Sequence, residues 1–431
     1  MSIPLPGRTL PLVPTGFGAL RHRNFRLLWI GQFVSLIGRW MQSVAQGWLV
    51  LELSGSAFDL GFVGFCSFSP ILLFALVGGA AADRVRRRRA LLWTQGTAMV
   101  LALSLALLTA LGIVEVWHIA VIAFGVGVTG AFDIPIRQSL LQDLVGRADL
   151  PNAIALNSLA FNGARLIGPA LAGVLLAAAG EATVFLLNAL SYLAVLFGLV
   201  RMRAVPGVMR VPGTWLAEMR EGVRWVASSA KARVILSLVV ISSVFGLPYS
   251  ILLPVFARDV LDVGSRGLGF LTGATGLGAV IGALYLARQS GDGGRGRVVA
   301  AAIVLLGSGL VAFSQSTHFA LSLSLLVVVG GAMIVQMASS NTLLQLLAPA
   351  ELRGRVVGFY MLAFMGMAPI GSLLAGVLAS EIGVRATVRI GGLVCLATGG
   401  VLAVRLPSSR RGAASATTSA RGSRRRTRSG P

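Results

Sequence analysis

The chain has 431 residues, of which 55% are hydrophobic and 12% are charged, and its mean hydropathy is +0.83. Soluble domains carry about 25% charged residues, so this composition excludes a water-soluble protein and predicts an all-α membrane protein. The formal net charge is +22, but the basic residues form short clusters between apolar runs, which argues against nucleic acid as a partner.

Twelve apolar segments are each long enough for a membrane-spanning helix, which takes about 20 mostly apolar residues. They begin near Leu27, Leu60, Ala90, Trp117, Asn152, Thr183, Arg233, Gly267, Val298, His318, Gly354 and Thr387. The first run begins too late and is too long for a signal peptide, so we expect it to be the first helix of the mature protein.

These segments divide the chain into five expected regions. They are a cytoplasmic N-terminal segment (1–26), a six-helix half (27–203), a cytoplasmic linker with an amphipathic helix (204–232), a second six-helix half (233–406) and a disordered basic cytoplasmic tail (407–431). In the linker, one face of the predicted helix carries Trp215, Leu216, Met219, Val223 and Val226. Such a helix is typical of a membrane surface, and we expect it and the tail to contact membrane lipids.

Arginine is distributed unequally between the two sides of the predicted spans. Clusters at 21–26, 84–89, 201–233 and 288–297 fall on one side, whereas the other side carries only Arg258, Arg266, Arg385 and Arg389. Cytoplasmic loops are rich in Lys and Arg, so we expect both termini in the cytoplasm. Lys231 is the single lysine among 37 basic residues, a bias that indicates a GC-rich bacterium and hence a bacterial cytoplasmic (inner) membrane.

The sequence repeats itself at a constant offset of 203 positions. The stretch from Leu140 to Leu176, "LLQDL…LAFNGARLIGPALAGVLL", returns from Leu343 to Ala379 as "LLQLL…LAFMGMAPIGSLLAGVLA". Both copies run from an even-numbered span through a loop into an odd-numbered span. Two six-helix repeats with the same orientation are typical of secondary transporters.

The loop between the second and third spans reads Gly79-x-x-x-Asp83-Arg84-x-Arg86-Arg87-Arg88. It resembles the Gly-x-x-x-Asp-Arg-x-Gly-Arg-Arg signature of the major facilitator superfamily and departs from it at Arg86. The resemblance implies the twelve-helix fold of that superfamily. It also implies a gate in which the acid caps helix 11 and Arg87 pairs with an acid on helix 4, which we expect to be Asp133. A carboxylate is favoured at a helix N-terminus in any case, and the alternative is that these arginines only set the topology.

Span 5 contains Gly168-Pro169-x-x-Ala172-Gly173. It resembles the Gly-Pro-x-x-Gly-Gly motif of superfamily members that export by antiport, with Ala172 in place of one Gly. Small residues let helices approach and Pro bends a span, so an ordinary packing face is the alternative. Across both halves the chain is similar to the enterobactin-exporter-like branch of the superfamily, whose members include suspected exporters of siderophores and drugs.

Charges inside a membrane are costly and need a reason. Asp133 is the only acidic residue predicted well within a span, and Arg137 follows one turn later. Arg39 and Arg165 are predicted near the midplane, about twice as deep as Asp133. We interpret them as binding an anionic substrate group; the alternatives are that they satisfy backbone carbonyls, reach toward Asp133 or face water.

Two polar faces are predicted to line the substrate pathway. The first span carries Gln32, Ser35, Arg39, Gln42 and Gln46, and the fifth carries Ser158, Asn162 and Arg165. In the second half the distinctive side chains are flexible thioethers, such as Met333 and Met361, which suit an adaptable apolar site; plain packing is the alternative. Together these faces suggest an amphipathic ligand.

The sequence therefore predicts a proton-coupled antiporter that exports a small amphipathic compound, anionic and siderophore-like or a drug. It contains no Gly-x-x-x-x-Gly-Lys-Ser/Thr loop, metal motif or disulfide framework. We therefore expect no enzyme activity, no cofactor and no metal, and a monomer. An importer of a small solute and a non-transporting sensor or assembly factor remain the alternatives.

Overall fold

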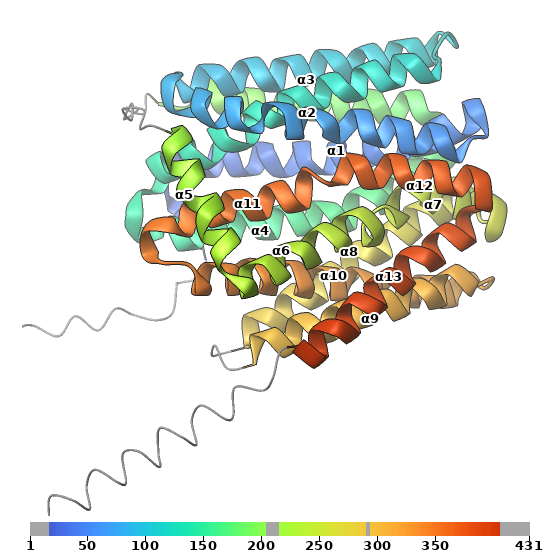
Figure 1. Ribbon diagram of the computed structural model, residues 1–431. Coiled ribbons are helices and arrows are strands. Elements are labelled where there is room, and N and C mark those ends of the chain that lie inside the picture. Colours follow the sequence, from blue (N-terminus) through green and yellow to red (C-terminus); the bar gives the residue numbers. More distant parts are fainter. Residues whose placement is uncertain (1–16, 204–214, 290–293, 406–431) are drawn as a thin grey trace, which may run out of the picture. The chain divides into compact units, whose positions relative to one another are not determined.

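The computed structural model describes residues 17–203, 215–289 and 294–405, which are helical and contain no strand (Figure 1). The helices are, in chain order, η1 (Gly18–Arg21), α1 (Arg23–Ser54), α2 (Ala57–Arg84), α3 (Arg87–Ala110), α4 (Val116–Arg201), α5 (Trp215–Ser228), α6 (Ala230–Ile241), η2 (Ser242–Gly246), α7 (Tyr249–Val255), η3 (Phe256–Val260), α8 (Gly264–Arg288), α9 (Arg295–Gln315), α10 (Phe319–Leu347), η4 (Ala350–Leu352), α11 (Arg353–Met365), α12 (Ala368–Ile382) and α13 (Val384–Arg405). The predicted all-α membrane fold is confirmed. The predicted tail 407–431 lies outside the described residues.

Nine helical segments in the described ranges are long and apolar enough to cross a membrane. They are Ala57–Phe74, Arg87–Ala110, Val116–Arg201, Ala230–Val260, Gly264–Arg288, Arg295–Gln315, Phe319–Leu347, Ala350–Ile382 and Val384–Val401. The segment Val116–Arg201 counts once although it holds three of the predicted spans. The number twelve stays a prediction.

The helix α4 is interrupted twice. Its 86 residues would extend about 129 Å as one straight helix, roughly four times the hydrocarbon thickness of a bilayer. Gly146 and Gly180 break it with φ of 69° and 73°, a left-handed conformation that glycine adopts without steric cost. The three pieces coincide with the predicted spans that begin near Trp117, Asn152 and Thr183.

The chain forms two compact units. The first contains residues 1–46 and 73–212, and the second contains residues 47–72 and 213–431. The helices α1 and α2 therefore each contribute to both units, so the unit boundaries differ from the predicted ones at residues 47–72. The division into two six-helix halves stays a prediction.

Close approaches between helices build the first unit. A Cβ at Gly31 would lie 2.6 Å from the Ala194 carbonyl oxygen, and one at Gly38 would lie 2.7 Å from the Asn188 Oδ1. The last piece of α4 therefore packs directly on α1, as small residues allow in membrane helices. On another part of α1, Trp29 Nε1 donates to the Leu156 carbonyl at 2.9 Å, which anchors the middle piece of α4.

In the second unit, α8 and α10 also approach each other closely at glycine residues. A Cβ at Gly282 would lie 2.6 Å from the Gly331 carbonyl oxygen. Between α6 and α8, the chain contains two π-helical segments, η2 and η3. Irregular turns of this kind are common at functional sites, and hydrophobic periodicity does not predict them.

The predicted linker helix is present as α5 and contacts α11. Glu221 forms an ion pair with Arg355, and a Cβ at Gly222 would lie 2.7 Å from the Phe359 ring. Val223 is exposed, while the side chains of residues 215–219 lie outside the described part. The position of α5 on the membrane surface stays a prediction.

Candidate functional site

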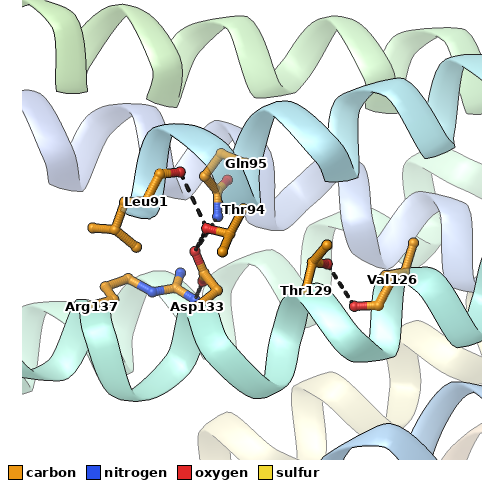
Figure 2. Close-up of polar contacts among 7 residues, drawn as sticks. All are labelled: Leu91, Thr94, Gln95, Val126, Thr129, Asp133 and Arg137. Atoms are coloured by element: carbon orange, nitrogen blue, oxygen red, sulfur yellow. Dashed lines mark hydrogen bonds and ion pairs between the residues drawn. The ribbon is translucent and has the colours of Figure 1, made fainter. Parts of the chain in front are cut away.

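Asp133 is the centre of a buried polar network between α3 and α4 (Figure 2). Its side chain is the only acidic one in the described part of the chain that is buried. Gln95 Nε2 donates to Asp133 Oδ1 at 2.6 Å, and Thr94 Oγ1 donates to the same oxygen at 3.0 Å. Arg137 forms an ion pair with Asp133 Oδ2. Three donors thus compensate the carboxylate for the loss of water.

The local sequence explains this geometry. Asp133 and Arg137 are four residues apart, so they lie on one face of α4 and pair with each other. Thr94 and Gln95 are neighbours on α3, and the Thr94 hydroxyl also lies 3.2 Å from the Leu91 carbonyl of its own helix. Sequence reasoning missed Thr94 and Gln95, although two polar residues in the apolar run of α3 are a signal that could have indicated them.

The predicted pairing of Arg87 with Asp133 is wrong. Arg87 forms its ion pair with Asp143, and both side chains are largely buried. Asp143 lies ten residues beyond Asp133 on α4, about 15 Å along the helix. Arg87 is the first residue of α3, so it is level with Asp143, whereas Asp133 is level with Thr94 and Gln95 further into the helix.

Arg88, the next residue of the arginine cluster, binds backbone carbonyls at the end of α4. Its Nε and Nη2 donate to the carbonyls of Leu199 and Val200, each at 2.7 Å. These carbonyls lie in the last turn of α4, where helix carbonyls lack partners and a cation is favoured. Asp83 and Arg84 belong to the last turn of α2, and their side chains lie outside the described part.

Gly78, the residue before the motif glycine Gly79, is in close contact with α4. A Cβ at Gly78 would overlap the Ala131 carbonyl, whereas one at Gly79 would have no neighbour within 4 Å. The gate role of the motif around Gly79 stays a prediction. What the structure describes is close packing of α2 on α4 two residues before Asp133.

The predicted polar face of α1 is largely buried within the first unit. Gln32 and Ser35 are buried, and their side-chain polar atoms have no hydrogen-bond partner among the described residues. Gln42 accepts a hydrogen bond from Asn188 Nδ2. Gln46 is half-buried. Unsatisfied polar groups of this kind are rare in folded proteins and call for an explanation.

Arg39 is an electrostatic neighbour of Arg137, which forms the ion pair with Asp133. Its Nε is buried and has no hydrogen-bond partner in the described part of the chain. Its charge acts on both Arg137 and Tyr192, and both of these groups also interact with Asp133. The charged members are two guanidinium groups and one carboxylate, a formal charge of +1.

Arg165 has different surroundings. Its guanidinium lies 5.7 Å from the centre of the Trp40 ring, a cation–π contact. Trp40 also meets Phe161 edge-on, with 5.8 Å between the ring centres. The two deep arginines therefore have different neighbours, because the charge of Arg39 acts on Arg137 and Tyr192 and Arg165 lies against Trp40.

Asn162 lines a cavity of about 470 Å³. Its Nδ2 donates to the Ser158 carbonyl at 2.8 Å, whereas its Oδ1 is buried without a partner. The cavity belongs entirely to the first unit, between residues 138–142 and 150–162 of α4. Its nine lining residues are Gln138, Leu141, Gln142, Leu150, Ile154, Asn157, Ser158, Phe161 and Asn162.

The motif of span 5 marks a helix crossing. A Cβ at Gly168 would lie 2.6 Å from the Trp40 Cβ and 2.9 Å from the Ile37 carbonyl oxygen, and Pro169 and Gly173 are buried. This is the packing role that small residues have in membrane helices. The antiporter role of the motif stays a prediction.

In the second unit, Met333 is buried and Met361 is exposed, so these methionines have different surroundings.

Comparisons with known proteins agree with this architecture. The family model described as transmembrane secretion effector matches residues 14–424. The multidrug efflux pump Tap of Mycolicibacterium fortuitum is 29% identical over 86% of this chain and 92% of that protein. The staphyloferrin A transporter of Staphylococcus aureus is 26% identical over 84% and 92% of the two chains. The enterobactin exporter EntS of Shigella boydii is 25% identical over 82% and 85%.

Solved transporter structures share the fold. A bacterial homologue of the iron transporter ferroportin, in an inward-facing state, superposes with a TM-score of 0.68 at 18% identity and covers 90% of this chain and 99% of its own. A POT family transporter in complex with 5-aminolevulinic acid gives a TM-score of 0.69 at 11% identity, over 89% and 96%. The chain therefore belongs to the transmembrane secretion effector family of the major facilitator superfamily, and it is a multi-pass membrane transporter rather than an enzyme.

Proposed function

We propose that this transporter is a proton-coupled exporter of a small amphipathic anion, either a siderophore-like compound or a drug. Arg39 is the observation that carries the proposal. Its buried Nε has no hydrogen-bond partner among the described residues, and the network around it has a formal charge of +1. Arg39 is half-buried, and a cation that is partly shielded from water is stabilised by an opposite charge, so the anionic group of the substrate binds beside Arg39.

The relatives and the motif of span 5 support export as the direction of transport. Two of the relatives are described as an efflux pump and an exporter, which favours export over import. An anion that leaves a cell also moves down a membrane potential that is negative inside. This contributes about 2.3 kcal/mol per charge for each 100 mV.

Protons are the coupling ion in this proposal, and Asp133 is the candidate carrier. The sequence contains no loop of the kind that binds ATP phosphates. Two six-helix halves rock around the site and expose it alternately to each side. The protein acts as a monomer in the bacterial inner membrane, with both termini in the cytoplasm and its apolar faces against lipid.

Flux through proteoliposomes of known orientation tests this proposal. The vesicles contain an anionic amphiphile, either a catecholate or an aromatic carboxylate, and a proton gradient is imposed. We expect gradient-dependent movement that falls at least tenfold in Arg39→Gln and also falls in Arg165→Gln. Arg266→Gln is the matched control, because Arg266 is exposed and the change removes the same charge away from the network.

Each other result points to one of the alternatives. Movement of cationic drugs alone, unchanged in the Arg39 and Arg165 variants, would make these arginines structural and leave a multidrug exporter. Movement only in the opposite direction would make the protein an importer. Absence of movement for every compound would favour the sensor or assembly factor.

A further inference from the structure

The cavity lined by Asn162 carries no charge. Of its nine lining residues, five carry an amide or a hydroxyl group and four are apolar. Its volume of about 470 Å³ lies in the range of small-molecule sites, which combine apolar walls with a few placed polar groups. The cavity is therefore chemically different from the network around Arg39 and Asp133, where charged side chains dominate.

The amide groups of this cavity differ in exposure. Gln138 and Gln142 are exposed and Asn157 is half-buried, so water can satisfy them when no ligand is present. Asn162 Oδ1 is buried and has no donor. Each amide offers both a donor and an acceptor, so the complementary group on a ligand is itself an amide or a hydroxyl. An acidic or basic group finds no counter-charge here.

An aromatic ring is next to these amides. Phe161 lines the cavity and meets Trp40 edge-on, so a planar ring on the ligand can pack against it. The cavity also contains Leu141, Leu150 and Ile154 on its apolar side. The lining thus suits an aromatic ring that bears an uncharged hydrogen-bonding group.

We propose that this cavity is a specificity-determining subsite, which binds an aryl amide or phenolic part of the ligand while the anionic group binds elsewhere. The inference rests on the proposed function, because it assigns the uncharged part of the same amphipathic ligand. A site that hydrogen-bonds its ligand through a buried polar atom, here Asn162 Oδ1, rejects an analogue that lacks the polar group, because that atom then stays unpaired. The cavity therefore selects among anions of equal charge.

Two probes isolate this selection. Hippurate and 4-phenylbutyrate carry the same carboxylate, the same ring and the same number of atoms between them, but only hippurate has an amide. Binding of each probe to the purified full-length protein is measured by titration calorimetry at one pH and salt concentration. We expect wild type to bind hippurate at least tenfold more tightly than 4-phenylbutyrate.

Two substitutions test the assigned residues. Gln142→Met keeps the length of the side chain but removes its amide, and Asn162→Leu removes the buried acceptor. We expect both to reduce the preference for hippurate to less than threefold, because each weakens hippurate binding more than 4-phenylbutyrate binding. Gln315→Met is the control, because Gln315 is an exposed amide at the end of α9 and its loss should keep the full preference.

The outcomes separate this inference from the proposed function. A wild type that binds neither probe or shows no preference overturns the inference. A preference that survives in both variants, or equal weakening of the two probes in both, overturns it as well. Arg39→Gln tests the anion site of the proposed function, because both probes carry a carboxylate that would bind there. If that variant binds both probes like wild type while the preference for hippurate remains, the anion site fails and the subsite stands.

Discussion

In the proposed function, Asp133 determines the formal charge that Arg39 and Arg137 present to an anionic ligand. In the native chain its carboxylate offsets one of the two guanidinium groups, those of Arg39 and Arg137. An anion therefore meets a formal charge of +1, and anything that neutralises Asp133 raises this to +2. Because Asp133 is buried and both arginines are half-buried, the difference is less screened than it would be at the surface.

We predict that Asp133→Asn binds 4-phenylbutyrate about tenfold more tightly, because the charge of the network rises by one. The amide oxygen of Asn can still accept the bonds from Thr94 and Gln95, so the fold should persist. The double variant Asp133→Asn with Arg137→Gln restores the charge to +1 and should bind within about threefold of wild type. Titration calorimetry measures both, and an unchanged affinity in the single variant would contradict the proposed anion site.

The ion pair between Arg87 and Asp143 makes a separate prediction. The exposed fractions of these side chains are 11% and 18%, so the pair is shielded from water and salt. In a double-mutant cycle with Arg87→Gln and Asp143→Asn, we expect a coupling free energy of about 1–3 kcal/mol in thermal unfolding. The matched cycle with Asp133→Asn should be additive within about 0.5 kcal/mol. The reverse pattern would support the pairing that the sequence predicts.

The sequence indicates contacts between residues of the same helix, because the helical repeat fixes their relative positions. The pairing of Asp133 with Arg137 follows from a spacing of four, and the burial of Gln32 follows from the polar face of α1. Contacts between helices depend on how far one helix is displaced along its neighbour, which a single sequence does not contain. The partner of Arg87 was therefore wrong, because Asp133 and Asp143 are both acids on α4 and only the alignment of α3 distinguishes them.

Among the helices, the middle piece of α4 and α1 make one of the closest contacts of the first unit. Gly168 lies at the crossing, and its neighbours Trp40 and Ile37 belong to the same stretch of α1 as Arg39. Since Trp40 also lies against Arg165 and Phe161, this crossing places the aromatic pair next to the cavity. The separation of the two helices at Gly168 therefore controls the geometry of the proposed subsite.

We predict that Gly168→Ala destabilises the protein by about 1–3 kcal/mol, because the new methyl group overlaps Trp40 and the α1 backbone. Gly96→Ala is the control, since Gly96 is also helical but a Cβ there has no neighbour within 4 Å. That change should stabilise α3 by up to about 1 kcal/mol, the difference in helix propensity. Thermal unfolding in detergent measures both, and equal effects would show that the crossing has no steric basis.

The sequence predicts the presence of helices better than their interruptions. Apolar runs of sufficient length locate the pieces of α4, and Gly146 and Gly180 lie close to the predicted boundaries. The π-helical segments η2 and η3 were not predicted, because one extra residue in a helical turn barely changes the apolar pattern. The close contact of Gly78 with α4 was also not predicted, because a contact between helices depends on how they are aligned.

At the scale of the whole molecule, the internal repeat has a structural counterpart in each unit. Gly371 is the residue 203 positions after Gly168, and a Cβ there would lie 2.8 Å from the Ser243 carbonyl oxygen. In each unit a glycine of the repeat thus packs against an earlier helix, α1 in the first and η2 in the second. The chemistry differs, because position 165 is Arg in the first copy and position 368 is Ala in the second. This difference supports an anion site in the first unit alone.

The distribution of arginine gives the last prediction, which concerns the orientation of the chain in the membrane. In a background with Cys66→Ser and Cys395→Ala, Arg89→Cys and Arg266→Cys each introduce one exposed thiol. Because clustered arginines are retained in the cytoplasm, a membrane-impermeant maleimide should label Arg266→Cys in intact spheroplasts. It should label Arg89→Cys at least tenfold less until the membrane is opened. The opposite pattern would invert the topology and contradict the expected cytoplasmic location of both termini.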